Sequence, residues 1–184
     1  MAPETTAEDV VALVDLADTL GVQIWLDGGW AVDACLGEQT RKHADVDIVV
    51  TEPQVAVLVA ALCDKGYRDV PRSDTRPWNF VLGDAYGHEV DFHVVALDDD
   101  GNGIYGPREN GERYPAASLG GTGTIVGRTV ACLTPEQQVI FHTGYPVDDE
   151  DWADVSRLCT RFGIPVPDDY ATFVATDHTG DDAP

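Results

Sequence analysis

The spacing of hydrophobic residues predicts a chain of both helices and strands. Residues 10–20 repeat their apolar side chains at helical spacing, whereas residues 22–26 form a nearly continuous apolar run typical of a buried strand. The same patterns continue to residue 162. They predict helices over residues 10–20, 29–36, 53–65, 135–143 and 148–162, and strands over residues 22–26, 45–50, 67–70, 78–82, 88–97, 124–126 and 129–132.

Local signals refine some of these boundaries. Two overlapping capping boxes, Thr5 with Glu8 and Thr6 with Asp9, are alternative starts for the first helix. The dipeptide Gly127-Arg128 is expected to turn between two short strands. The stretch 98–123 is rich in Gly, Asp and Pro, so we expect a long irregular segment that covers another part of the molecule.

The 184 residues are enough for one domain with a substantial core. We expect a catalytic core over residues 1–130, a helical part of the same compact unit over 131–176, and a frayed tail over 177–184. No apolar run is long enough to span a bilayer. The acidic N-terminal segment lacks the basic and apolar regions of a secretion signal, so a cytoplasmic location is expected.

Charge limits the classes of partner. The formal net charge is −22, with 33 acidic residues against 11 Lys and Arg. Such a field repels nucleic acid and anionic membranes and attracts small cations and metal ions, although it also keeps a protein in solution. We therefore expect a small-molecule partner rather than a nucleic acid or a membrane. The four cysteines form no C-x-x-C pair, which favours buried reduced thiols over a zinc site or disulfides.

The candidate chemistry begins with two aspartates on one strand and two glycines before it. Asp45 and Asp47 are two apart, so on an extended strand they point the same way. A divalent cation needs such hard oxygen ligands. Gly28 and Gly29 lie upstream, where phosphate could approach bare backbone N–H groups at a helix start. The alternative is that Asp-x-Asp is merely the solvent face of an amphipathic strand.

A later strand carries further acids. Glu89 and Asp91 share one face, together with His93. Nucleotidyl transfer to a hydroxyl needs an α-phosphate held in line, its charge neutralised by magnesium, and a group that takes the hydroxyl proton. Two carboxylates on one strand, a third on an adjacent strand and a Gly-Gly turn for the triphosphate would meet these needs.

These residues resemble a known superfamily. The pattern Gly28-Gly29, Asp45-Val46-Asp47 and Asp91 is similar to the DNA polymerase β-like minimal nucleotidyltransferases. The run GGWAVDACLGEQTRKHADVDI, with Val90-Asp91-Phe92-His93 and Phe141-His142-Thr143-Gly144-Tyr145, resembles the small antibiotic nucleotidyltransferases. The resemblance is greatest to the lincosamide type and extends to the aminoglycoside 2″-adenylyltransferases.

The resemblance implies a fold and a set of roles. The fold is α/β (α+β), a mixed-sheet nucleotidyltransferase core with flanking helices on one side and a small C-terminal helical part. Asp45, Asp47 and Asp91 would bind Mg²⁺, and Asp91 would also be the base, with Glu89 as the alternative base. ATP or another NTP would be the co-substrate. Relatives in this group include dimers, so a homodimer is an alternative to a monomer.

Other residues are weaker candidates. Arg41 and His43, just before the metal strand, are candidate nucleotide-site residues, and His142 and Tyr145 are candidate substrate-site residues. Each has a structural alternative, such as a surface arginine or a loop hydrogen bond. Asp98, Asp100, Asn102, Gly103 and Glu109 match a calcium-loop pattern, but a strand enters and Gly106-Pro107 follows, so we interpret the stretch as an acidic turn.

The resulting hypothesis is Mg-dependent transfer of AMP from ATP to a hydroxyl of an antibiotic, with release of pyrophosphate. A lincosamide acceptor is favoured by the motif run, while the negative charge would suit an aminoglycoside. Two alternatives are a nucleotidyltransferase that modifies a protein or tRNA, as in toxin–antitoxin systems, and a binding module without catalysis.

Overall fold

The computed structural model describes residues 4–177. Helices and strands alternate from residue 7 to residue 64, strands then follow one another to residue 131, and helices complete the described chain, close to the order that the hydrophobic pattern predicts. The helices are α1 (Ala7–Leu20), α2 (Gly28–Leu36), α3 (Glu52–Asp64), α4 (Pro135–Phe141), α5 (Asp149–Phe162) and α6 (Ala171–Asp177). The strands are β1 (Ile24–Asp27), β2 (Asp45–Thr51), β3 (Arg68–Val70), β4 (Asn79–Gly83), β5 (Glu89–Leu97), β6 (Gly103–Tyr105), β7 (Glu112–Tyr114), β8 (Thr122–Ile125) and β9 (Arg128–Ala131).

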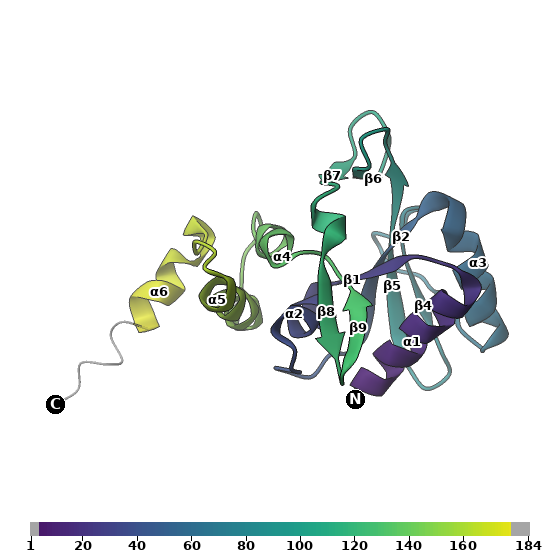
Figure 1. Ribbon diagram of the computed structural model, residues 1–184, viewed down its shortest axis with the longest axis horizontal. Coiled ribbons are helices and arrows are strands. Elements are labelled where there is room, and N and C mark those ends of the chain that lie inside the picture. Colours follow the sequence, from purple (N-terminus) through teal and green to yellow (C-terminus); the bar gives the residue numbers. More distant parts are fainter. Residues whose placement is uncertain (1–3, 178–184) are drawn as a thin grey trace.

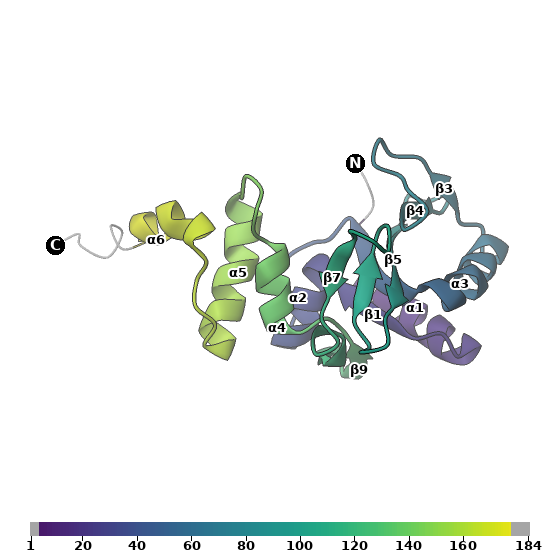
Figure 2. The same cartoon turned by 90° about the horizontal axis from the view of Figure 1, so that it is seen from above.

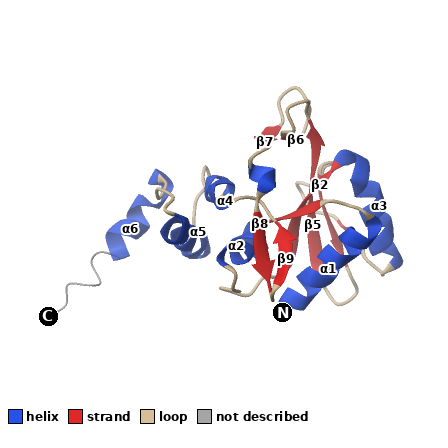
Figure 3. Cartoon of the chain, viewed as in Figure 1, coloured by secondary structure: helices blue, strands red, loops and turns tan. Residues whose placement is uncertain are grey.

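The main sheet is mixed, with strand order β1-β2-β5-β4-β3 and the β6–β7 hairpin attached to β5. Only the pair β2–β5 in this sheet is parallel among the described residues. Parallel neighbours need a long crossover, which α3, β3 and β4 supply between β2 and β5. β8 and β9 form a separate hairpin. The mixed-sheet α/β fold expected from the sequence is confirmed, and Figure 3 shows its strands between two groups of helices.

Alternation along β2 separates the core from the candidate site. Val46, Ile48 and Val50 are buried in the main hydrophobic core, which also contains residues of α1 and α3. Asp45 and Asp47 therefore project from the opposite face, since successive side chains of a strand alternate. Further along this second face, Val49 is buried in a smaller cluster with Tyr114 and Leu133. The carboxylates thus lie at the open end of a face that is otherwise covered.

The helices form two groups on either side of the strands. In Figures 1 and 2, α1 and α3 lie at the right, while α4, α5 and α6 lie at the left. The C-terminal group has its own core, which Val155, Leu158 and Tyr170 share with Val32 of α2 and Val139 of α4. The second group corresponds to the small C-terminal helical part expected from the sequence, and it packs against α2. No helix in residues 4–177 has the length and apolar character needed to cross a membrane.

Several local predictions can be compared with the structure. The first helix uses the capping box of Thr6 and Asp9 rather than that of Thr5 and Glu8. The turn between β8 and β9 is Val126-Gly127, both with positive φ, and not Gly127-Arg128. The fourth helix ends at Phe141 with His142 as its C-cap, earlier than Gly144. The helix α6 is an element that the hydrophobic pattern did not indicate.

The stretch 98–123 is more regular than its composition indicates. β6 and β7 pair within it, and a 3-10 turn follows at Ser118–Gly120. The side chain of Asp98 accepts hydrogen bonds from Asn102 and pairs with Arg113 on β7, which holds the hairpin together. These contacts engage the carboxylate that would have been the first calcium ligand, in agreement with the acidic-turn interpretation.

Candidate active site

Strand register brings three aspartates into one row. Asp27 at the end of β1 is paired with Asp47 on β2, and Asp47 is paired with Asp91 on β5. Neighbouring strands lie about 5 Å apart, so residues paired on one face have side chains in contact range. The row arises because β2 and β5 are parallel and in this register. A shift of one residue would turn Asp91 to the other face.

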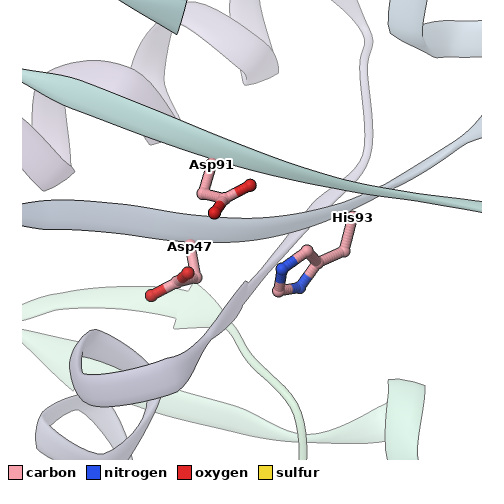
Figure 4. A group of neighbouring side chains, drawn as sticks. All are labelled: Asp47, Asp91 and His93. Atoms are coloured by element: carbon pink, nitrogen blue, oxygen red, sulfur yellow. The ribbon is translucent and has the colours of Figure 1, made fainter. Parts of the chain in front are cut away.

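Asp47, Asp91 and His93 form a group of potential metal ligands. One ligand atom from each lies within 4.8 Å of the others. Figure 4 shows the three side chains converging, with a ring nitrogen of His93 on the side of the two carboxylates. The group differs from the predicted set in one member, because Asp45 lies outside it and is paired with Glu89 in the register. Asp47 and Asp91 come together as the pattern required, with His93 in place of Asp45.

The electrostatics of this group show a site with excess negative charge. Burial raises the pKa of Asp47 to about 7; His93 opposes this, and Asp45, Asp27 and Asp91 add to it. Burial also raises the pKa of Asp91, helped by Asp45. The Oδ1 atom of Asp91 is buried and has no hydrogen-bond partner among the described residues. A cation would relieve both the repulsion and the unpaired oxygen.

Asp27 is a buried acid whose charge is well compensated. Its Oδ1 atom accepts hydrogen bonds from the backbone N–H of Gly28 and from Nε2 of Gln138, both at 2.8 Å. Its Oδ2 atom lies 3.1 Å from Nδ1 of His93. Burial alone would raise the pKa of Asp27, but these hydrogen bonds and the charge of His93 lower it below its usual value. Correspondingly, Asp27, Asp47 and Asp91 raise the pKa of His93 to about 9, against the effect of its burial.

The glycine turn lies against the second aspartate. Gly28 begins α2 with φ +56°, a left-handed conformation, and a Cβ atom there would collide with the Asp47 carboxylate. A Cβ atom on Gly29 would collide with His43 and Arg41. Both positions therefore require glycine for space, and Gly28 also requires it for its backbone conformation.

Gly28→Ala is expected to lower kcat by about 10²-fold, because moving Asp47 misaligns the site. The same change at Gly37, which has φ +81° and nothing within 4 Å, is the matched control. It adds a similar left-handed strain of about 1–2 kcal/mol without a collision. Steady-state kinetics and thermal melts of both variants test this. Equal losses of kcat in the two variants would contradict a close contact with Asp47.

Arg41 and His43 are held by acids from helices. Nε and Nη2 of Arg41 donate to Asp154 of α5 at 3.1 and 3.0 Å. Nε2 of His43 lies 2.6 Å from Oδ2 of Asp33, and both side chains are buried. The structure thus places both residues beside the glycine turn, with their polar groups engaged within the protein. A role toward a nucleotide stays a prediction.

A cavity of about 460 Å³ opens beside Asp47. Its polar lining includes the predicted substrate residues His142 and Tyr145, which follow α4. The N–H at Nδ1 of His142 donates to the Gln138 carbonyl, and the Tyr145 hydroxyl donates to Asp151. The remaining lining residues are Asp27, Gly28, His93, Tyr105, Glu112, Tyr114, Gln138, Phe141 and Thr143. The cavity therefore combines acidic and aromatic groups and contains no Lys or Arg in its lining.

Glu89, the alternative base, lines a smaller cavity. Glu89 accepts a hydrogen bond from Arg72 at 2.6 Å, and the two form an ion pair. Both line a hollow of about 180 Å³ with Asp45 and Asp91. Asp91 thus belongs to the cluster with Asp47 and also to this hollow, while Glu89 is partly neutralised by its arginine.

Sequence patterns missed two parts of this site. Asp27 carries a weak signal, since an acid directly before a glycine at a helix start is a typical N-cap, but nothing local indicates that it also contacts His93. Gln138 carries no signal at all, because it is one of two adjacent glutamines in α4. Its hydrogen bond to Asp27 spans 111 residues of sequence.

Comparisons with known proteins identify the family of this chain. The family model for aminoglycoside-2″-adenylyltransferase matches residues 9–158. A lincosamide resistance protein from Staphylococcus haemolyticus is 30% identical over 154 residues, which cover 83% of this chain and 94% of that protein. Among solved structures, lincosamide antibiotic adenylyltransferase LnuA with lincomycin bound matches with a TM-score of 0.75 and 28% identity, covering 85% of this chain and 98% of that one.

A further solved structure shares the fold at lower sequence identity. ANT(2″)-Ia in complex with adenylyl-2″-tobramycin matches with a TM-score of 0.65 and 23% identity, over 85% of this chain and 89% of that one. This likeness concerns the fold alone. The family match and the lincosamide resistance relative each span most of the chain. The chain therefore belongs to the aminoglycoside-2″-adenylyltransferase family of antibiotic nucleotidyltransferases.

Proposed function

We propose that this protein transfers AMP from ATP to a hydroxyl of a lincosamide antibiotic, with magnesium required and pyrophosphate released. The observation that carries the proposal is the register that aligns Asp27, Asp47 and Asp91 across three strands next to the glycine turn. The name of the 30% identical relative supports the choice of a lincosamide.

The donor set fits a magnesium ion. Asp47 and Asp91 offer hard carboxylate oxygens, and the unpaired buried Oδ1 of Asp91 needs a partner. Asp45, on the same strand face, is the third predicted ligand. When bound, the ion would neutralise charge on the phosphates. His93 is a softer donor, so we assign the metal to the carboxylates.

The chain's own residues would carry the proton and hold the substrates. The acceptor oxygen forms a bond to the α-phosphorus of ATP, the bond from that phosphorus to the pyrophosphate oxygen breaks, and the hydroxyl proton moves to a carboxylate. We assign the proton to Asp91, because Glu89 is engaged by Arg72. Backbone N–H groups of the glycine turn other than that of Gly28, which donates to Asp27, would bind phosphate oxygens.

The cavity beside Asp47 is the proposed acceptor site. His142, Tyr145 and the aromatic residues around them suit an acceptor with both a sugar-like hydroxyl face and apolar parts. An aminoglycoside is the second candidate, favoured by the description of the matching family and by the carboxylates in the lining. We favour the lincosamide because the lincosamide resistance relative is similar over 83% of this chain, whereas the charge of the cavity lining is a less specific observation.

The test is incubation with ATP, magnesium and either lincomycin or kanamycin, followed by mass analysis. Lincomycin is expected to gain one AMP mass, and omission of magnesium is expected to prevent the gain. A gain only on kanamycin would move the acceptor assignment to aminoglycosides. Label transferred from ATP to a protein or RNA, with neither antibiotic modified, would contradict the proposal and favour a macromolecular substrate.

Single replacements of Asp91 and Glu89 are expected to show which of the two is the base. Asp91→Asn should lower kcat by about 10³-fold, whereas Glu89→Gln should lower it less than about tenfold. The reason is that Asp91 belongs to the cluster with Asp47, while Glu89 is paired with Arg72. Single-turnover kinetics with saturating ATP measures this. The opposite order would identify Glu89 as the base.

A further inference from the structure

Asp27 contacts three parts of the active site without belonging to the predicted catalytic set. It is buried, with 4% of its surface exposed, at the point where β1 ends and α2 begins. Its partners are the backbone of Gly28 in the glycine turn, the His93 ring in the ligand group and the amide of Gln138 on α4. The carboxylate of Asp27 therefore joins the glycine turn, β5 and α4, the helix that leads into the acceptor cavity.

The chemistry of these contacts determines the orientation of two side chains. A carboxylate accepts hydrogen bonds and donates none, so Nδ1 of His93 must carry a proton, and the Gln138 amide must turn Nε2 toward Asp27. With Nδ1 occupied, Nε2 is the nitrogen of His93 that remains to face Asp47 and Asp91. Figure 4 shows a ring nitrogen on that side.

We propose that Asp27 is a positioning residue, which holds Nε2 of His93 toward Asp47 and Asp91 and docks α4 beside them through Gln138. The proposal rests on the proposed function, and although Asp27 lines the acceptor cavity, its assigned role is exerted through His93 and Gln138. Partners of this kind fix the tautomer and direction of an imidazole, and their loss usually lowers activity by about 10–100-fold.

The asparagine variant is the sharpest test of the first contact. In Asp27→Asn, the amide oxygen can still accept from Gly28 and Gln138, but the amide N–H₂ then faces Nδ1 of His93. Two donors cannot face each other, so His93 must lose the proton at Nδ1 or turn away. We expect kcat to fall about 10²-fold while the KM for ATP changes less than about threefold.

Gln138→Met tests the second contact. It leaves the Asp27–His93 hydrogen bond and removes the one from α4. We expect a rise of about tenfold in the KM for the antibiotic, because the wall of the cavity shifts, and a change in kcat below about threefold. If this variant instead lowers kcat as much as Asp27→Asn with an unchanged antibiotic KM, Asp27 is only a structural acid and the proposal is wrong.

The exposed turn before β5 offers a matched control. Asp84 accepts from backbone N–H groups through Oδ1 and pairs with Nδ1 of His88 at 2.9 Å through Oδ2, which is the same pattern far from the cavity. Asp84→Asn should therefore change the tautomer of His88 and leave kcat and both KM values as in the wild type.

A direct readout comes from long-range ¹H–¹⁵N spectra of protein with ¹⁵N-labelled histidine. We expect a protonated Nδ1 on His93 in the wild type and its loss in Asp27→Asn. An unprotonated Nδ1 in the wild type overturns the proposal, even if the variant does not fold. A folded Asp27→Asn that keeps kcat within threefold of the wild type also overturns it. If the wild type modifies neither antibiotic, the proposed function fails, and the wild-type spectrum still tests the orientation of His93.

Discussion

Asp47→Asn is expected to lower kcat by about 10³-fold or more while the protein becomes more stable without metal. The loss of activity follows from removing one of the two carboxylates that face each other across β2 and β5. The gain in stability follows from the raised pKa of Asp47, about 7, which means that ionising this buried group opposes folding at neutral pH. Kinetics with saturating ATP and urea unfolding in EDTA measure the two effects.

The opposite signs of these effects make the result specific. A variant that simply misfolds would lose both activity and stability. Asp99→Asn, in an exposed turn away from the cluster, is the control and should change neither. Magnesium should raise the melting temperature of the wild type more than that of Asp47→Asn, since binding to the folded state stabilises it. Unchanged turnover in Asp47→Asn would remove this residue from the mechanism.

Arg41→Met is expected to destabilise the protein by about 3–5 kcal/mol, because it leaves a buried acid without its partner. The side chain of Asp154 is only 2% exposed, and its Oδ1 atom already lacks a hydrogen bond among the described residues. The pair joins the loop before β2 to α5, so its loss should also loosen the C-terminal helices. Urea unfolding followed by circular dichroism measures the change.

Two further variants test whether the loss of stability comes from the Arg41–Asp154 pair or from the loss of a surface charge. Arg128→Met breaks exposed ion pairs with Asp15 and Asp18, and we expect little change in the unfolding midpoint. The double variant Arg41→Met with Asp154→Leu removes both charges of the pair and should recover most of the stability lost in Arg41→Met. If the double variant is as unstable as the single one, the charge of Asp154 is not the cause.

Local sequence determined most helices and strands and part of the candidate active site. Apolar spacing indicated most helices and strands, since each needs one buried face and its period shows in the chain. Two-residue spacing placed Asp45 and Asp47 on one face of β2, and the space required at Gly28 agrees with the glycine turn. The prediction that Asp91 joins the Asp45 and Asp47 pair rested on the order of the strands along the chain and on the chemistry required, and the resemblance added to it.

Only the tertiary structure decided which side chains meet. The parallel register of β2 and β5 sets Asp91 beside Asp47 and Glu89 beside Asp45, and it brings His93 into the group where three acids were expected. Asp27 joins Gln138 across 111 residues, and Arg41 joins Asp154 across 113. Such contacts cannot be predicted from the spacing of residues along the chain. A polar residue that is buried against a distant partner has the same local sequence pattern as a polar residue that faces solvent.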